Sequence, residues 1–188
     1  TSVTDASLSN TGAGSVRVDE ANALNLLGLN VANGNAIFNA GGAITDDAAA
    51  TIGVSGNAAL NGTSITLGDT ATDLFNVGTL TFGSSGAVSI HEDSQIDLTA
   101  ANSAASLVLT AESDSLNDAA GAILSVSGNA RLTANGVGGA ITLGDNSGDT
   151  TNFGSLDIDS IGPVFVSENS SMNLNAGVHR GRAASTLR

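Results

Sequence analysis

Few residues in this 188-residue sequence could do chemistry, and the densest group is the tripeptide at residues 91–93. It joins an imidazole, His91, to two carboxylates, Glu92 and Asp93, which are the groups that general acid–base catalysis uses. The glutamate recurs in similar contexts at Glu20 and Glu168, whereas the histidine does not. Because a single catalytic site does not require three copies, we interpret the recurring glutamate as a solvated turn residue.

A second group offers oxygen atoms at alternate positions of one loop: Asp145, Ser147, Asp149 and Thr151. This spacing is typical of the first ligands of a calcium-binding loop. The glycine and the closing glutamate of such loops are missing, because Thr150 and Leu156 stand in their places. We therefore favour a plain corner loop and expect no cofactor other than weakly bound Ca²⁺.

A third group is basic and lies near the end of the sequence: Arg180, Arg182 and Arg188. The chain has only five arginines and no lysine against eighteen acidic residues, so its formal net charge is −13. Residues 1–179 therefore carry −16. The simplest interpretation of the basic group is a solvent-facing loop, and the alternative is a contact with the acidic flank of a neighbouring molecule.

Composition excludes several classes of protein. Nucleic-acid-binding proteins and proteins that bind anionic membranes need basic residues, which are scarce here. The sequence has no cysteine, which excludes disulfides and thiolate zinc sites. No stretch approaches the roughly 18 apolar residues that a membrane span needs. We therefore expect no nucleic-acid partner and no membrane insertion. No signal peptide opens the sequence, so a secreted protein would be a mature fragment.

Short strands are the elements that must carry these residues. Apolar residues make up 41% of the chain, enough for a folded core, and glycine, asparagine, serine and aspartate separate the apolar runs. Most runs alternate apolar, polar and apolar side chains, which is the period of a strand with one buried face. We predict strands at residues 16–18, 24–26, 65–67, 80–82, 88–90, 96–98, 107–109, 141–143, 156–158 and 164–166.

The sequence also repeats itself. Residues 52–58 (IGVSGNA) return as residues 124–130 (LSVSGNA), 72 positions later. A glycine-rich insertion of four residues within 134–140 then changes the offset to 76. At that offset residues 65–69 match residues 141–145, both of which read ITLGD. A chain with such long internal repeats is typical of stacked architectures.

The repeat predicts a single β-solenoid segment over residues 1–188, with copies at 1–72 and 73–148 and a partial copy at 149–188. Similar patterns begin at nearly even intervals, at Leu80, Leu107, Leu132 and Leu156. Each copy is therefore expected to hold three rungs of about 25 residues. Such rungs predict an all-β fold, a right-handed parallel β-helix, in which each rung buries its apolar face against its neighbours. A β-sandwich is the alternative, but it does not explain the rung period.

This fold makes a prediction for the core. Large apolar residues at matching positions of the copies should point inward and stack on aligned faces. The residues expected to do so are Val88, Ile90, Ile96, Leu98, Leu124, Val126, Ile141 and Leu143.

The repeat resembles the long-repeat passenger regions of filamentous-haemagglutinin-like adhesins. The phrases that carry the resemblance lie at residues 18–26, 38–46, 54–60 and 65–69, and it extends over nearly the whole chain. It implies a right-handed β-helix in a bacterial exoprotein and a role as a secreted or surface-attached rod.

We therefore predict a structural repeat segment of a bacterial extracellular adhesin or surface fibre, located outside the cell or on its surface. Its partners would be other copies of the rod, further repeats of the same chain, or host surfaces, abiotic surfaces and glycans. One alternative is a subunit that stacks end to end into an extracellular filament. Another is a carbohydrate-active β-helix enzyme. We expect no enzymatic activity, because only Arg17 and Arg131 lie within the repeats and could line an acid–arginine cleft.

Overall fold

The computed structural model describes residues 4–179, 186 and 187, and every helix or strand in this part of the chain is a β-strand. No helix there could cross a membrane. The strands are β1 (Asp5–Ala13), β2 (Val16–Glu20), β3 (Leu24–Asn33), β4 (Ala36–Ala40), β5 (Ile44–Gly62), β6 (Ile65–Leu67), β7 (Leu74–Ser84), β8 (Ala87–Glu92), β9 (Ile96–Leu98), β10 (Ala101–Ala104), β11 (Ser106–Ala111), β12 (Leu116–Asp118), β13 (Ile123–Ala134), β14 (Ile141–Leu143), β15 (Thr150–Ser160), β16 (Val164–Val166), β17 (Leu174–His179) and β18 (Thr186–Leu187).

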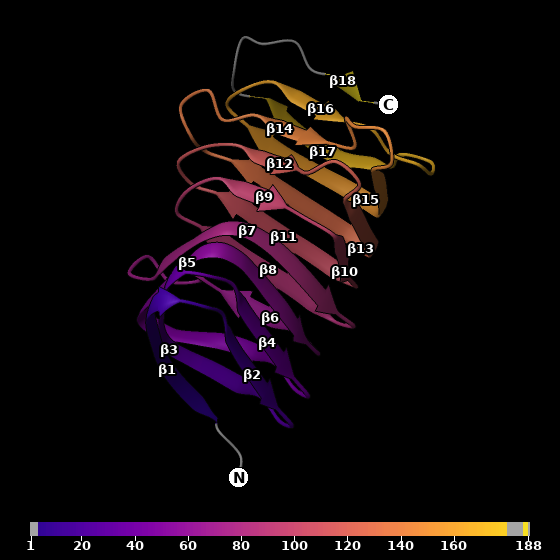
Figure 1. Cartoon of the computed structure of the whole chain (residues 1–188). Helices are drawn as coiled ribbons and strands as arrows, with labels where there is room; N and C mark the ends of the chain where they lie inside the picture. The colour runs from indigo at the N-terminus through magenta and orange to yellow at the C-terminus, as the bar shows by residue number, and fades with distance from the viewer. Residues whose placement is uncertain (1–3, 180–185, 188) are drawn as a thin grey trace.

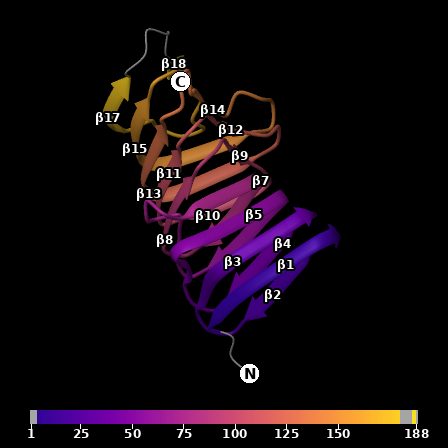
Figure 2. The same ribbon diagram turned by 90° about the vertical axis from the view of Figure 1, so that its left-hand side faces the viewer.

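The strands form a parallel β-solenoid of about 8 turns with about 22 residues per turn. Each strand pairs in parallel with neighbouring turns, so that β1 and β18 lie at opposite ends of the stack (Figure 1). The view turned by 90° shows the strands in the same order along the stack (Figure 2). The predicted β-helix is confirmed, although its turns are shorter than the spacing of the sequence patterns suggests.

The strand pairings divide the solenoid into three faces, which the chain visits in the order 1, 2, 3. Face 1 contains β2, β4 and β10, with residues 57–62, 79–84, 123–126 and 150–153. Face 2 contains β6, β8, β11 and β17, with residues 24–26, 44–46, 129–134 and 155–160. Face 3 contains β9, β12, β14, β16 and β18, with residues 8–13, 28–33, 51–54 and 74–77. β7 bends between residues 74–77 on face 3 and residues 79–84 on face 1. The next strand of face 3 is β9, and its last residue, Leu98, pairs with Leu80 just after this bend.

The core runs through the solenoid as one continuous cluster of buried apolar side chains. All ten predicted triplets lie in strands, and the eight residues expected to point inward are at most 2% exposed. Phe38, Phe75 and Phe82 are the largest fully buried side chains. The alternation of buried and partly exposed residues along each strand follows from the period of the pleat.

Matching positions of the two copies lie on different faces. Val16 belongs to the column of face 1 that continues through Ala36 and Ala58. Its counterpart Val88 instead stacks on Ile65, in face 2. The same step of one face separates Ile65 in face 2 from Ile141 in face 3. The expectation that counterparts stack on aligned faces is therefore wrong.

The length of the turn explains this rotation. The first copy, residues 1–72, is long enough for three turns of about 22 residues and about one third of another. Each copy thus starts one face further around the solenoid than the copy before it. The Ser-Gly-Asn bulge shows the result: in β5 the bulge after Val54 joins face 3 to face 1, whereas in β13 the bulge after Val126 joins face 1 to face 2.

The four-residue insertion lies in a corner. It falls between β13 and β14, outside the strand ladders, and Val137 at its tip is fully exposed. The turn from Ala130 to Leu156 is longer than the turn from Leu107 to Ala130, yet the strands on either side keep their pairing. An insertion at such a place costs little because it changes only an exposed loop.

Candidate functional site

Acidic residues gather along one edge of the solenoid, the corner between face 2 and face 3. Four successive turns each place two carboxylates there, which accounts for eight of the eighteen acidic residues. They are Asp46 and Asp47, Asp69 and Asp73, Glu92 and Asp93, and Glu112 and Asp114. We call this edge the acidic corner.

A small hollow of about 220 Å³ lies in the acidic corner. The residues that line it are Gly68, Thr70, Ala71, Asp73, His91, Asp93 and Glu112. At its rim the Nε2 atom of His91 lies 3.3 Å from the Oε2 atom of Glu112 in the next turn, and both side chains are nearly half exposed. The hollow thus presents one imidazole among carboxylates to solvent.

The three side chains of residues 91–93 do not converge on one point. His91 reaches outward to Glu112, whereas Glu92 is completely buried. The Oδ2 atom of Asp93 accepts a hydrogen bond of 2.7 Å from the backbone N–H of Phe75, one turn below. The interpretation of Glu92 as a solvated turn residue is wrong. Its side chain is buried, and its carboxyl group accepts a backbone hydrogen bond that a neighbouring strand would otherwise accept.

Glu92 and Asp93 together complete the hydrogen bonding of β7. The Oε1 atom of Glu92 accepts from the N–H of Val77 at 3.0 Å, next to the bond from Phe75 to Asp93. The strand β9 begins only at Ile96, so these two N–H groups would otherwise lack a partner. The two carboxylates therefore supply the hydrogen-bond acceptors for β7 that a neighbouring strand would otherwise supply.

The same arrangement recurs in the partial third copy, one face further around. The Oε1 atom of Glu168 accepts from the N–H of Phe153 at 3.0 Å, and the Oδ1 atom of Asn169 accepts from the N–H of Thr151 at 2.8 Å. A structural need for these hydrogen bonds explains why the glutamate recurs. Glu20, the counterpart in the first copy, is also buried, and its Oε1 atom accepts from the N–H of Asn22.

Burial changes the acidity of Glu92. Desolvation of the charged form raises the pKa of Glu92 to about 8, against the opposing effect of the hydrogen bonds from Val77 and Ser94. The nearby charges of Asp97 and Asp93 raise this pKa further.

Two aspartate triads form at the corners that follow the ITLGD motifs. Asp46, Asp69 and Asp73 bring carboxylate oxygens within 4.8 Å of one another, a spacing at which three carboxylates could hold a cation. Both oxygens of Asp73 already accept hydrogen bonds, from the N–H groups of Ala49 and Thr70. Desolvation raises the pKa of Asp46 to about 6, and this carboxylate accepts from the N–H of Gly68. The triad therefore shapes the corner whether or not it holds a cation.

The second triad contains two of the four residues expected in a calcium loop. Asp145 and Asp149 join Asp118, which the sequence places on the preceding turn. Thr151 is buried, and its hydroxyl donates to the carbonyl of Ser167. Ser147 is exposed at the tip of that loop. The structure thus brings Asp145 and Asp149 together, with Asp118 as the third carboxylate.

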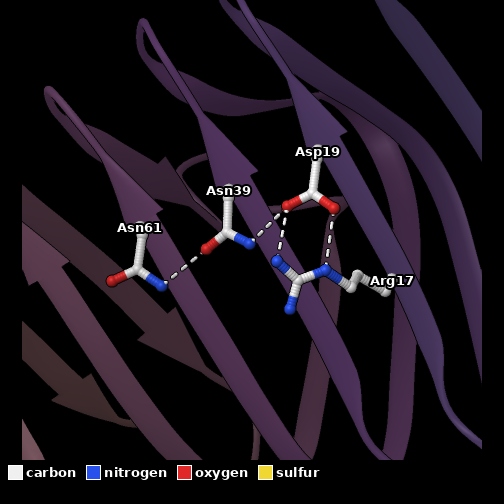
Figure 3. A network of polar contacts seen from close by, with 4 residues as sticks. All are labelled: Arg17, Asp19, Asn39 and Asn61. Carbon is white, nitrogen blue, oxygen red and sulfur yellow. Dashed lines mark hydrogen bonds and ion pairs between the residues drawn. The ribbon is translucent and has the colours of Figure 1, made fainter.

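A polar ladder crosses the outside of face 1 (Figure 3). The guanidinium of Arg17 donates two hydrogen bonds, of 2.7 and 2.8 Å, to the carboxylate of Asp19. The amide of Asn39 donates to Asp19 at 2.7 Å, and that of Asn61 donates to Asn39 at 2.9 Å, so successive turns are linked. The bonds from Arg17 and Asn39 hold the pKa of Asp19 below its usual range. An open hollow lies beside this ladder, over Ala21, Ala40 and Gly41.

The remaining candidates, Arg180, Arg182 and Arg188, lie outside the described residues.

Comparison with known families bears on the repeat. The family described as Repeats of unknown function (DUF5649) matches residues 13–82 and again residues 85–157. The starts of the two matches are separated by the same offset at which the sequence repeats, and together the matches cover more than half of the chain. The chain belongs to this repeat family. No curated protein and no solved structure matches it significantly.

The two segments that match the family each carry one of the recurring corner groups. Both triads, for example, lie within the two matched segments. Inspection of single loops missed Asp46 and Asp118, because each lies on the turn before the loop it faces. The signal that could have found them is their alignment between the two copies, ahead of an ITLGD motif in each.

Proposed function

We propose that the chain is a rigid rod segment of a bacterial extracellular adhesin or surface fibre. The observation that carries the proposal is the unbroken stack: parallel pairing links β1 through successive turns to β18, and one apolar core runs along it. Each turn buries the apolar edges of its neighbours, so the segment resists bending and lengthens in proportion to the number of turns.

The outer surface supports the same function. Ladders of amide and carboxylate groups, such as that from Arg17 to Asn61, link neighbouring turns on the outside as the core links them on the inside. The excess of acidic residues favours a rod that stays soluble and does not bind nucleic acid. The resemblance to haemagglutinin-like passenger regions favours a place outside the cell, with other copies, surfaces or glycans as partners.

Arrays of one, two and three added repeats test the rod. Three and one third turns at about 4.8 Å per turn predict that each repeat adds about 16 Å to the length. Small-angle scattering measures this length, and we expect a linear increase at constant cross-section. A maximum dimension that grows only as a compact globule does would overturn the rod.

Antibodies against the chain test its location. Intact cells of the source bacterium should bind the antibody without permeabilisation and should lose the signal after mild protease treatment. An antibody against a cytoplasmic protein is the control for lysis. Labelling that requires permeabilisation would contradict the proposal, even if the arrays prove to be rods.

A further inference from the structure

The buried corner glutamate has a property that its structural role does not require. Glu92 is 0% exposed, and its Oε1 atom accepts from the N–H of Val77 at 3.0 Å and from the hydroxyl of Ser94 at 3.2 Å. Its Oε2 atom is buried and has no hydrogen-bond partner. An ionised Glu92 would therefore keep one carboxylate oxygen buried without a hydrogen-bond partner, at a large cost in free energy.

The charges around Glu92 do not compensate for this burial. Asp93 and Asp97 follow it in the chain, Asp69 and Asp73 belong to the corner of the preceding turn, and Glu112 belongs to the corner of the next turn. The imidazole of His91 points to Glu112, and no ion pair joins Glu92 to a basic group within the described residues. The surroundings are thus uniformly acidic except for one exposed histidine.

We propose that Glu92 is built into the solenoid as a neutral carboxylic acid, so that its ionisation as the pH rises loosens this corner of the rod. Protonation removes the charge while Oε1 keeps both of its hydrogen bonds. The cost that remains is an unpartnered O–H group, which is far smaller than that of an unpartnered buried charge.

The partial third copy repeats the hydrogen-bond geometry on which the proposal rests. Glu168 accepts with Oε1 from the N–H of Phe153 and from the hydroxyl of Ser170, and its Oε2 atom is also buried without a partner. Glu168 thus shares the hydrogen-bond arrangement of Glu92, one face further around the solenoid. The proposal concerns the solenoid itself and does not depend on where the rod is located.

The direction of the pH effect follows from the raised pKa of Glu92. In the unfolded chain the carboxyl group has its ordinary pKa near 4.5, whereas burial raises the folded value to about 8. The folded state therefore keeps a proton that the unfolded state has lost. The contribution to stability is complete below the unfolded pKa and decreases as the pH rises through the window from about 4.5 to 8.

A side-chain carboxyl titration tests the protonation state directly. The chain has four glutamates, so ¹³C labelling of glutamate gives four carboxyl signals, and Glu92→Gln assigns one of them. We expect the signal of Glu92 to stay in the protonated form at pH 6 and to titrate near pH 8 in the folded wild-type chain. A signal that titrates between pH 4 and 5 while the chain stays folded would overturn the proposal.

Stability measurements test its consequence. Between pH 5 and 8 the folding equilibrium of the wild type relative to Glu92→Gln should fall by about two to three orders of magnitude, since the amide cannot ionise. Asp47→Asn, at an exposed carboxylate of the acidic corner two turns away, is the control and should change the pH profile little. Parallel profiles for wild type and Glu92→Gln would contradict the proposal. If Glu92→Gln does not fold, variants at Glu20, Glu112 and Glu168 assign the other three signals, and the fourth then belongs to Glu92. The titration of the wild type still decides whether Glu92 is protonated.

Discussion

At the scale of single residues, the corners explain why particular residues recur. Gly68 and Gly144 hold the same place in the two ITLGD motifs, with φ values of 68° and 70°. Their N–H groups donate to Asp46 and Asp118, which are themselves counterparts. Each motif therefore encodes a tight left-handed corner that an aspartate of the preceding turn holds in place.

Replacing Gly68 with alanine should destabilise the chain by on the order of 3 kcal/mol, because alanine disfavours this backbone conformation. A Cβ atom there would also lie 2.2 Å from the carbonyl oxygen of His91. Chemical denaturation measures the change. The control is Gly53→Ala, where a Cβ atom would have no neighbour within 4 Å. Equal effects of the two substitutions would refute this account of the corner.

At the scale of the strand, one side of each element faces the core and the other faces solvent. β11 shows this clearly, since Leu109 is 0% exposed while Val108 beside it is 39% exposed. The alternation that predicted the strands therefore also identified which residues point inward. What it could not identify is the face on which a strand lies, because all three faces require the same apolar, polar, apolar pattern.

The two sides of β11 should respond differently to truncation. Leu109→Ala removes buried atoms and leaves a cavity, so we expect a loss of about 2–4 kcal/mol in the free energy of unfolding. Val108→Ala, in the same strand, should cost less than about 0.5 kcal/mol. Urea denaturation of both variants checks this. A loss at Val108 as large as that at Leu109 would show that β11 is not oriented as described.

At the scale of the whole molecule, the fold could be predicted from the sequence, but the number of turns in each repeat could not. The nearly even spacing of Leu80, Leu107, Leu132 and Leu156 suggested one rung for each interval. In the structure Leu107, Ala130 and Leu156 share face 2, whereas Leu80 lies on face 1. Corner loops differ in length, so sequence spacing alone does not give the length of a turn. The buried corner glutamates were missed for a different reason: they stand at the ends of strands, next to other polar residues, and so look like turn residues.

The net charge of the rod should make its stability depend on salt. Acidic residues in four successive turns of one corner repel one another, and dissolved ions screen this repulsion. We expect the melting temperature at neutral pH to rise between low salt and about 0.3 M NaCl, where the Debye length is shorter than about 8 Å. Calorimetry at both salt concentrations measures it. An unchanged or lower melting temperature would show that self-repulsion does not limit stability.

The central claim is that a repeat makes three and one third turns, and cysteine cross-linking tests it most directly because the chain has no cysteine of its own. In the structure Ser89 pairs with Val108 in the next turn. If a repeat with the offset of 72 residues instead made three whole turns, each turn would have about 24 residues and Ser89 would lie beside Ser113. We predict that Ser89→Cys with Val108→Cys forms a disulfide under mild oxidation, since neighbouring strands lie about 4.8 Å apart, and that Ser89→Cys with Ser113→Cys does not. Cross-linking of the second pair and not the first would contradict the account.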